Sequence, residues 1–226
     1  MEDSHINKKN DFSCNYLEFL TILCSETERM CKFSPDSKAK IGNTLIYIAN
    51  HTGKLSKTKL LKLIYMMESM MVRKYHTPFL AVPYEVWKWG PVQKDLFADL
   101  SDNLYLMKDY ITSYVSEGKT YFKAKTEFSD DEFSQVEISV MDEILKTYGK
   151  KNAQQLEAIL HKPDSLWYNA AKRNNVLDSF NDGTCNSTDI KIDFSELLAD
   201  DNDKEEYLES LAIRRTANNL NAHSNV

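Results

Sequence analysis

The sequence predicts an α+β fold: a predominantly helical single globular domain with a small β-hairpin or extended element and helical extensions at its ends. Apolar residues recur at helical spacing through most of the chain. Aromatic and β-branched residues flank Glu117-Gly118, as in a hairpin. With 226 residues and 42% hydrophobic content, the chain can bury one substantial core.

Three parts are expected along the chain. Residues 1–34 form an N-terminal helical arm that ends near Ser34-Pro35, since proline interrupts a helix. Residues 35–175 form the compact domain. Residues 176–226 form a loop rich in Asn, Asp and Ser, followed by an acidic C-terminal helical tail.

The first helices of the domain are predicted from their caps and apolar spacing. One helix spans about 38–51. Ser56 can accept hydrogen bonds from the first free amides of the next helix, which runs to Val72. That helix is apolar on a wide surface, so it should be central, with methionines filling the core at Met66, Met67, Met70 and Met71.

Residues 81–89 are expected to be extended after Thr77-Pro78 ends the central helix, and to turn at Gly90-Pro91. Pro91 then suits the first turn of another helix. On an extended chain, Trp87 and Trp89 would point to one face. Tryptophan serves equally as a core residue and as an interface anchor, so both roles stay open.

Later elements follow in order. Strands at 110–115 and 120–124 form the predicted hairpin. Ser129 and Glu132 have capping-box spacing before a helix through Leu145. Short helices are expected near 153–161 and 165–173, and a final helix near 204–218.

Three segments, in this order, resemble the Panacea domain family: Lys59 to Tyr65 (KLLKLIY), Trp87 to Val92 (WKWGPV), and His161 through Trp167 to Ala170. This family contains SocA-like antitoxins and phage-associated proteins and was formerly a domain of unknown function. The resemblance covers about 38–173. The third segment departs from the family pattern at Leu160 and Leu166, where threonine and proline are usual.

The resemblance implies an antitoxin of a toxin–antitoxin system, often carried on a prophage. Such a cytoplasmic protein binds and neutralises a small protein toxin encoded by a neighbouring gene. Alternatively, it is an adaptor that delivers the toxin to a cytosolic protease. The candidate partner-binding residues are those of the motifs: Lys62, Tyr65, Trp87, Trp89, Gly90, Pro91, Val92, His161 and Trp167. For Lys62 and Tyr65, the structural alternative is that each covers the edge of the core and keeps its polar end in water.

We do not expect an enzyme. His161 and Asp164 could act as a general acid–base pair, but no other segment supplies a nucleophile or a metal-ligand set. A histidine that ends a helix beside a Pro-Asp turn commonly caps backbone carbonyls. The glycines are scattered singly, so no phosphate-binding loop and no cofactor site is expected.

Charge and cysteine spacing argue against three other kinds of partner. The net charge is −6, and the segment from Asp189 to Glu209 contains nine acidic residues and two lysines. This acidic balance disfavours nucleic acid as a partner. Lys54, Lys57, Lys59 and Lys62 form the densest basic cluster, so a DNA-binding regulator is the third choice. Four cysteines without close pairs predict no metal site, and no membrane span is recognised.

Overall fold

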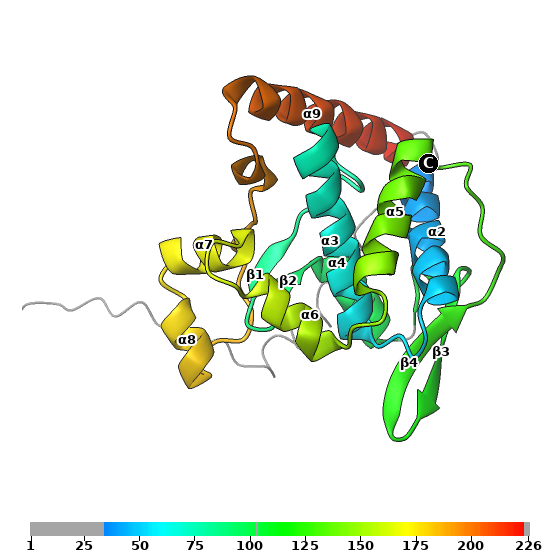
Figure 1. The fold of residues 1–226 in the computed structure, drawn as a ribbon. Helices are drawn as coiled ribbons and strands as arrows, with labels where there is room; N and C mark the ends of the chain where they lie inside the picture. Colours follow the sequence, from blue (N-terminus) through cyan, green and yellow to red (C-terminus); the bar gives the residue numbers. More distant parts are fainter. Residues whose placement is uncertain (1–33, 103, 224–226) are drawn as a thin grey trace, which may run out of the picture.

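The computed structural model describes residues 34–102 and 104–223, so the arm expected over 1–34 lies outside it apart from Ser34. The fold class is confirmed: helices predominate, and the strands of the described residues pair as two small antiparallel hairpins (Figure 1). Within the described residues, no helix is both long enough and apolar enough to cross a lipid bilayer.

The elements are as follows in chain order. The helices are α2 (Pro35–His51), α3 (Lys57–Tyr75), α4 (Lys94–Ser101), α5 (Gln135–Tyr148), α6 (Ala153–Leu160), α7 (Leu166–Arg173), α8 (Leu177–Asp182) and α9 (Asp201–His223), with a 3-10 turn, η1, at Phe194–Leu197. The strands are β1 (Glu85–Trp87), β2 (Gly90–Val92), β3 (Ile111–Ser116) and β4 (Lys119–Ala124).

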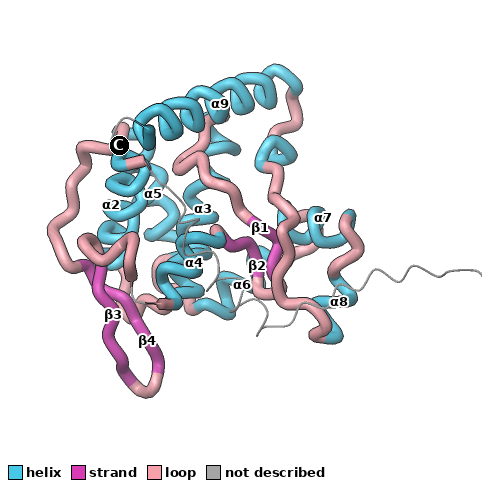
Figure 2. The backbone as a smooth tube through the Cα atoms, turned by 180° about the vertical axis from the view of Figure 1, so that it is seen from behind, coloured by secondary structure: helices cyan, strands magenta, loops and turns pink. Residues whose placement is uncertain are grey.

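Helix α3 is the centre of the molecule, as its wide apolar surface predicted. It is buried on most of its circumference, and α2, α4, α5 and α6 pack around it (Figures 1 and 2). Met67 and Met71 are buried in the core, which confirms their structural role. Ser56 caps the helix by accepting a hydrogen bond from Lys59 N at 3.3 Å.

The capping box before α5 is formed by residues other than those predicted. Ser134 and Glu137 form it, and α5 begins at Gln135. Ser129, predicted as the cap, instead hydrogen-bonds the side chains of Asn43 and Asp131. Because Ser129–Glu132 and Ser134–Glu137 have the same spacing, spacing alone could not distinguish the two pairs.

The hairpin β3–β4 was predicted with its turn. Glu117 and Gly118 occupy the turn with φ values of 54° and 70°, and two successive left-handed residues suit the twist of a two-residue hairpin. Phe122 N donates to Leu55 O at 2.9 Å, which ties the hairpin to the segment before α3.

The segment beyond residue 175, which we assigned to a loop and tail, contributes buried side chains to the same core. These include Phe180, Phe194 and Tyr207. Helix α9 crosses the end of the bundle formed by α2, α3 and α5 (Figure 2).

A buried ion cluster joins α2, α5 and α9. Glu137 Oε1 accepts from Lys40 Nζ at 2.6 Å and from Arg214 Nη2 at 3.0 Å. Burial opposes ionisation of Glu137, but the two cations outweigh it and hold the pKa of its carboxyl below the usual value. Glu137 therefore caps α5 and also pairs with a cation from each of α2 and α9.

Replacing Glu137 with alanine should lower the free energy of unfolding by about 3 kcal/mol, since it leaves Lys40 buried without its partner and removes the capping box. Glu143→Ala is the matched control on the same helix. Glu143 pairs with Lys74 at the surface, so its loss should cost under about 1 kcal/mol. Urea denaturation measures both, and equal losses would show that the cluster does not stabilise the fold.

Candidate functional site

The first two family motifs meet where the hairpin β1–β2 closes against α3. Trp87 pairs with Gly90, and Lys88 and Trp89 form the two-residue turn. The segment 186–192 runs along the other edge of β1, with Val86 N donating to Ile190 O and Lys88 N donating to Asn186 O, each at 2.9 Å. Strand β1 therefore has β2 on one edge and this segment on the other.

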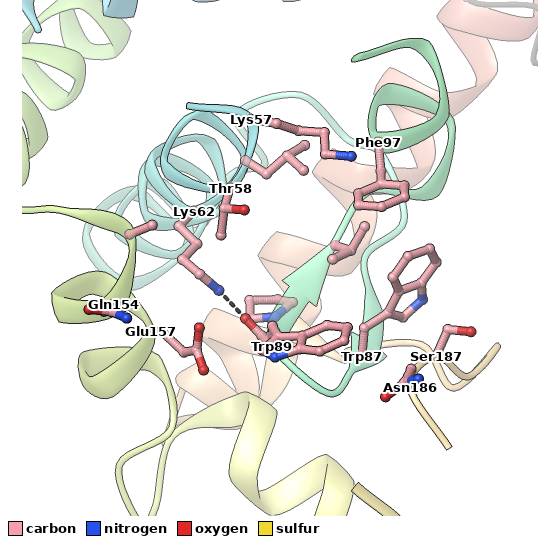
Figure 3. Close-up of a pocket in the computed structure, with 14 residues that line it drawn as sticks. Lys57, Thr58, Lys62, Trp87, Trp89, Phe97, Gln154, Glu157, Asn186 and Ser187 are labelled. Carbon is pink, nitrogen blue, oxygen red and sulfur yellow. Dashed lines mark hydrogen bonds between the residues drawn. The ribbon is translucent and has the colours of Figure 1, made fainter. Parts of the chain in front are cut away.

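The two indoles line the same pocket but differ in burial (Figure 3). Trp87 is buried and its Nε1 donates to Glu85 Oε2 and Thr188 O, whereas Trp89 is 52% exposed. Trp87 ends β1 and Trp89 belongs to the turn, so the chain is not extended through both residues as predicted. One tryptophan is thus a core residue and the other is available to a partner.

Gly90 and Pro91 belong to β2 and not to a turn followed by a helix, so this detail was also wrong. Helix α4 begins at Lys94, and its cap is the side chain of Gln93, which accepts from Leu96 N. Gly90 has φ 108°, a conformation that favours glycine strongly. The WKWGPV motif therefore encodes a turn and its return strand.

The third motif contacts the β1–β2 hairpin through Trp167 of α7. Trp167 is buried, and its Nε1 donates to Trp87 O at 2.8 Å. The ring of His161 stacks on the Trp167 ring, with centroids 3.7 Å apart and 2° between the planes. Burial and the nearby charge of Lys62 lower the pKa of His161 to about 4, so its imidazole is neutral at pH 7.

Lys62 joins all three motifs. Its Nζ donates to the carbonyl oxygen of Trp89. A Cβ at Gly90 would lie 2.6 Å from Lys62 Nζ and 3.5 Å from His161 Nε2, so only glycine leaves this space free. Burial lowers the pKa of Lys62 to about 8, although the carboxylate of Glu157 opposes this shift.

These residues line or support one open pocket of about 520 Å³ (Figure 3). Its walls are mainly apolar and come from α3, the β1–β2 hairpin, α4, α6 and the segment at 186–187. Lys57 and Lys62 contribute the cations, and Glu157 contributes a carboxylate. The aromatic side chains in the lining are Trp87, Trp89 and Phe97.

Most of the predicted site residues converge here. Lys62, Trp87, Trp89, Pro91 and Val92 line the pocket. Gly90 is part of β2, next to Lys62 and His161. His161 stacks on Trp167, which contacts the hairpin through the carbonyl oxygen of Trp87.

Two predicted features lie outside this arrangement. Tyr65 packs in the core, where its ring contacts Tyr84 and Phe194, each with centroids 5.4 Å away. In the described chain no hydrogen bond or ion pair joins His161 to Asp164, and His161 Nε2 has no hydrogen-bond partner. The arrangement therefore lacks the carboxylate that would orient His161 as a general base.

The basic cluster does not form a continuous face. Lys54 pairs with Glu117 at 2.7 Å, and Lys59 donates to Gly149 O at 2.6 Å. Lys57 donates to Ser101 Oγ at 2.7 Å, with its Nζ 4.0 Å from the centroid of the Phe97 ring. Each lysine thus has a separate protein partner, which gives no support for a phosphate-binding surface.

Several pocket residues were not singled out in the sequence. Glu157 lies one helical turn before His161, so the spacing of α6 could have placed both on the same side. Phe97, Asn186 and Ser187 had no comparable signal, since their position depends on how distant segments pack.

His76, Asp203 and Glu206 form a group that could hold a metal ion, because one ligand atom of each lies within 4.8 Å of the others. Nδ1 of His76 is 3.4 Å from a carboxylate oxygen of Asp203 and 3.4 Å from one of Glu206. The group connects the end of α3 to the start of α9, away from the pocket. Its contacts are equally those of a surface ion-pair cluster.

The fold and site define a helical α+β domain whose central helix, hairpin and α6–α7 segment build an apolar pocket. A family model described as "Antitoxin SocA-like, Panacea domain" matches residues 60–168, which contain most of the three motif segments. The resemblance is thereby confirmed, and it supports an antitoxin-like role in general and a protein as partner. Comparison with curated proteins and with solved structures gave no match.

Gly90→Ala should destabilise the protein by about 2 kcal/mol, since alanine is strained at φ 108° and its methyl group would displace the Lys62 ammonium from the Trp89 carbonyl. Gly118→Ala is the matched control. Gly118 also has positive φ but faces open space, so Gly118→Ala should lower the free energy of unfolding by only about 1 kcal/mol. Thermal or urea unfolding compares them, and equal losses would contradict the tight packing at Gly90.

Proposed function

We propose that the protein is an antitoxin that binds a small protein toxin in the cytoplasm and neutralises it through the pocket. The observation that carries this proposal is the convergence of the family motifs on one pocket with Trp89 at its edge. The match to the family model of SocA-like antitoxins supports a protein as the partner. Neutralisation needs only a stable complex that occupies the toxin's own functional surface.

Trp89 is the best anchor for such a partner. Large aromatic side chains contribute much of the energy of protein interfaces, mainly when binding removes them from water. Trp89 is 52% exposed, while its backbone carbonyl is fixed by Lys62. A rigid backbone under an exposed indole limits the entropy that binding must cost.

We further propose that the protein acts by stoichiometric binding and not by catalysis. His161 is the residue that first suggested chemistry, yet its ring is stacked on Trp167. Its low pKa leaves it a weak base at neutral pH. This supports a structural role for His161 next to the hairpin.

Co-expression with the product of each neighbouring gene tests the proposal. One product should arrest growth alone, and the protein should restore growth and co-purify with that product. Disappearance of the product, in place of a complex, would instead favour delivery to a protease. If no neighbour is toxic or bound, the antitoxin proposal is wrong.

Trp89→Ala should abolish rescue or weaken binding by at least about 2 kcal/mol, a loss typical of a central aromatic anchor. Tyr105→Ala is the matched control, because Tyr105 is 61% exposed and does not line the pocket. Growth rescue and a pull-down with both purified variants give the comparison. Equal behaviour of the two variants would place the partner on another surface.

A further inference from the structure

Lys62 carries a charge that the described protein only partly satisfies. Its side chain is buried, with the residue 2% exposed, and its Nζ lies on the wall of the pocket. An ammonium group has three N–H donors, and among the described residues the Trp89 carbonyl accepts from one. No carboxylate of the described residues lies within ion-pairing distance of it.

Buried charges in proteins are usually paired, because leaving water is costly for an isolated ion. Glu157 lies on the α6 side of the pocket near Lys62, but no ion pair or hydrogen bond joins the two among the described residues. The cation is therefore placed where a carboxylate from outside could pair with it. Lys57 adds a second cation at the Phe97 side of the same pocket.

The remaining walls require an apolar group on the same ligand. Leu61, Val92 and the rings of Trp87, Trp89 and Phe97 surround the space beside Lys62. An Asp or Glu side chain would satisfy the cation but leave these walls without contacts. A C-terminal residue presents its side chain and its carboxylate from one carbon atom, so it can satisfy both.

We propose that the pocket receives the C-terminal residue of the partner chain, with its α-carboxylate paired to Lys62 and its apolar side chain between Trp89 and Phe97. The inference rests on the proposed function and adds the chemistry that the partner must present. A volume of about 520 Å³ holds such a residue and part of the one before it.

Binding should depend on pH through Lys62. Pairing with a carboxylate raises the pKa of Lys62 above its value of about 8 in the free protein, so binding takes up protons. Affinity is then greatest well below pH 8, where Lys62 of the free protein is protonated, and decreases as the pH rises through 8. The other ionisable groups that face this site are Glu157 and His161 on the α6 side and Lys57 on α3. Burial also lowers the pKa of Lys57.

Two small probes test the proposal without any partner: N-acetyl-L-phenylalanine and its C-terminal amide. Tryptophan fluorescence or NMR titration of the full chain should show the acid binding at least about tenfold more tightly, the gain expected from a charge-assisted hydrogen bond. The preference should decrease between pH 8 and 10. Equal affinity for the two probes, or no binding of either, overturns the proposal.

Lys62→Met keeps the length of the side chain and removes its charge, so it should abolish the preference for the acid. Lys74→Met is the matched control on the same helix and should retain it, because Lys74 pairs with Glu143 at the surface and does not line the pocket. A melting temperature for each variant verifies folding. A preference that survives Lys62→Met, or is lost only in Lys74→Met, contradicts the assigned role of Lys62.

Removing the last residue of the co-purifying partner completes the test. The truncated partner should lose most of its affinity for the wild-type protein. It should bind the wild-type protein no more tightly than it binds the Lys62→Met variant. If neighbours are neutralised but the truncation and the probes have no effect, only this inference fails. If no neighbour is neutralised, the proposed function fails whatever the probes show.

Discussion

A helix that is buried on nearly every side must direct its few polar side chains to fixed partners. Helix α3 does this with two lysines one turn apart in the chain. Lys59 donates to Gly149 O at the junction of α5 and α6, and Lys62 donates to Trp89 O in the hairpin. Both partners are backbone carbonyls, so these contacts position main chain and not only side chains.

The pocket is a consequence of that constraint. Fixing the Trp89 carbonyl against α3 fixes the turn between β1 and β2, which holds the Trp87 ring inward and leaves the Trp89 ring exposed. Trp167 makes the same kind of contact from the other side, to the carbonyl of Trp87. Residues from two distant segments, Lys62 of α3 and Trp167 of α7, therefore hold the two carbonyls on either side of Lys88. Residues of the three family motifs therefore either form the short β1–β2 hairpin or hold it in place.

Much of the fold could be predicted from local sequence signals. The central helix, the cap at Ser56 and the turn at Glu117-Gly118 depend on residues that are close in the chain. The turn at Lys88-Trp89 was missed because neither residue is typical of turns, while Gly90-Pro91 next to it is. Its position is set by Lys62 and by the segment at 186–192, which no local pattern reveals.

The site was predictable in part for the same reason. The motifs identified Lys62, Trp89 and Trp167, but not that only Trp89 is exposed. The far wall at Asn186 and Ser187 comes from a segment whose composition indicated a loop outside the domain. Composition indicates only the local preference of a segment, whereas the conformation of this segment is fixed by hydrogen bonds to β1.

Hydrogen–deuterium exchange on the protein with and without its co-purified partner tests most directly whether the pocket is the binding site. The account predicts slower exchange in the complex for amides of β1, β2 and the first turns of α6, with the β3–β4 hairpin unchanged. Slower exchange confined to β3–β4 or to α9, with no change around Trp89, would contradict it.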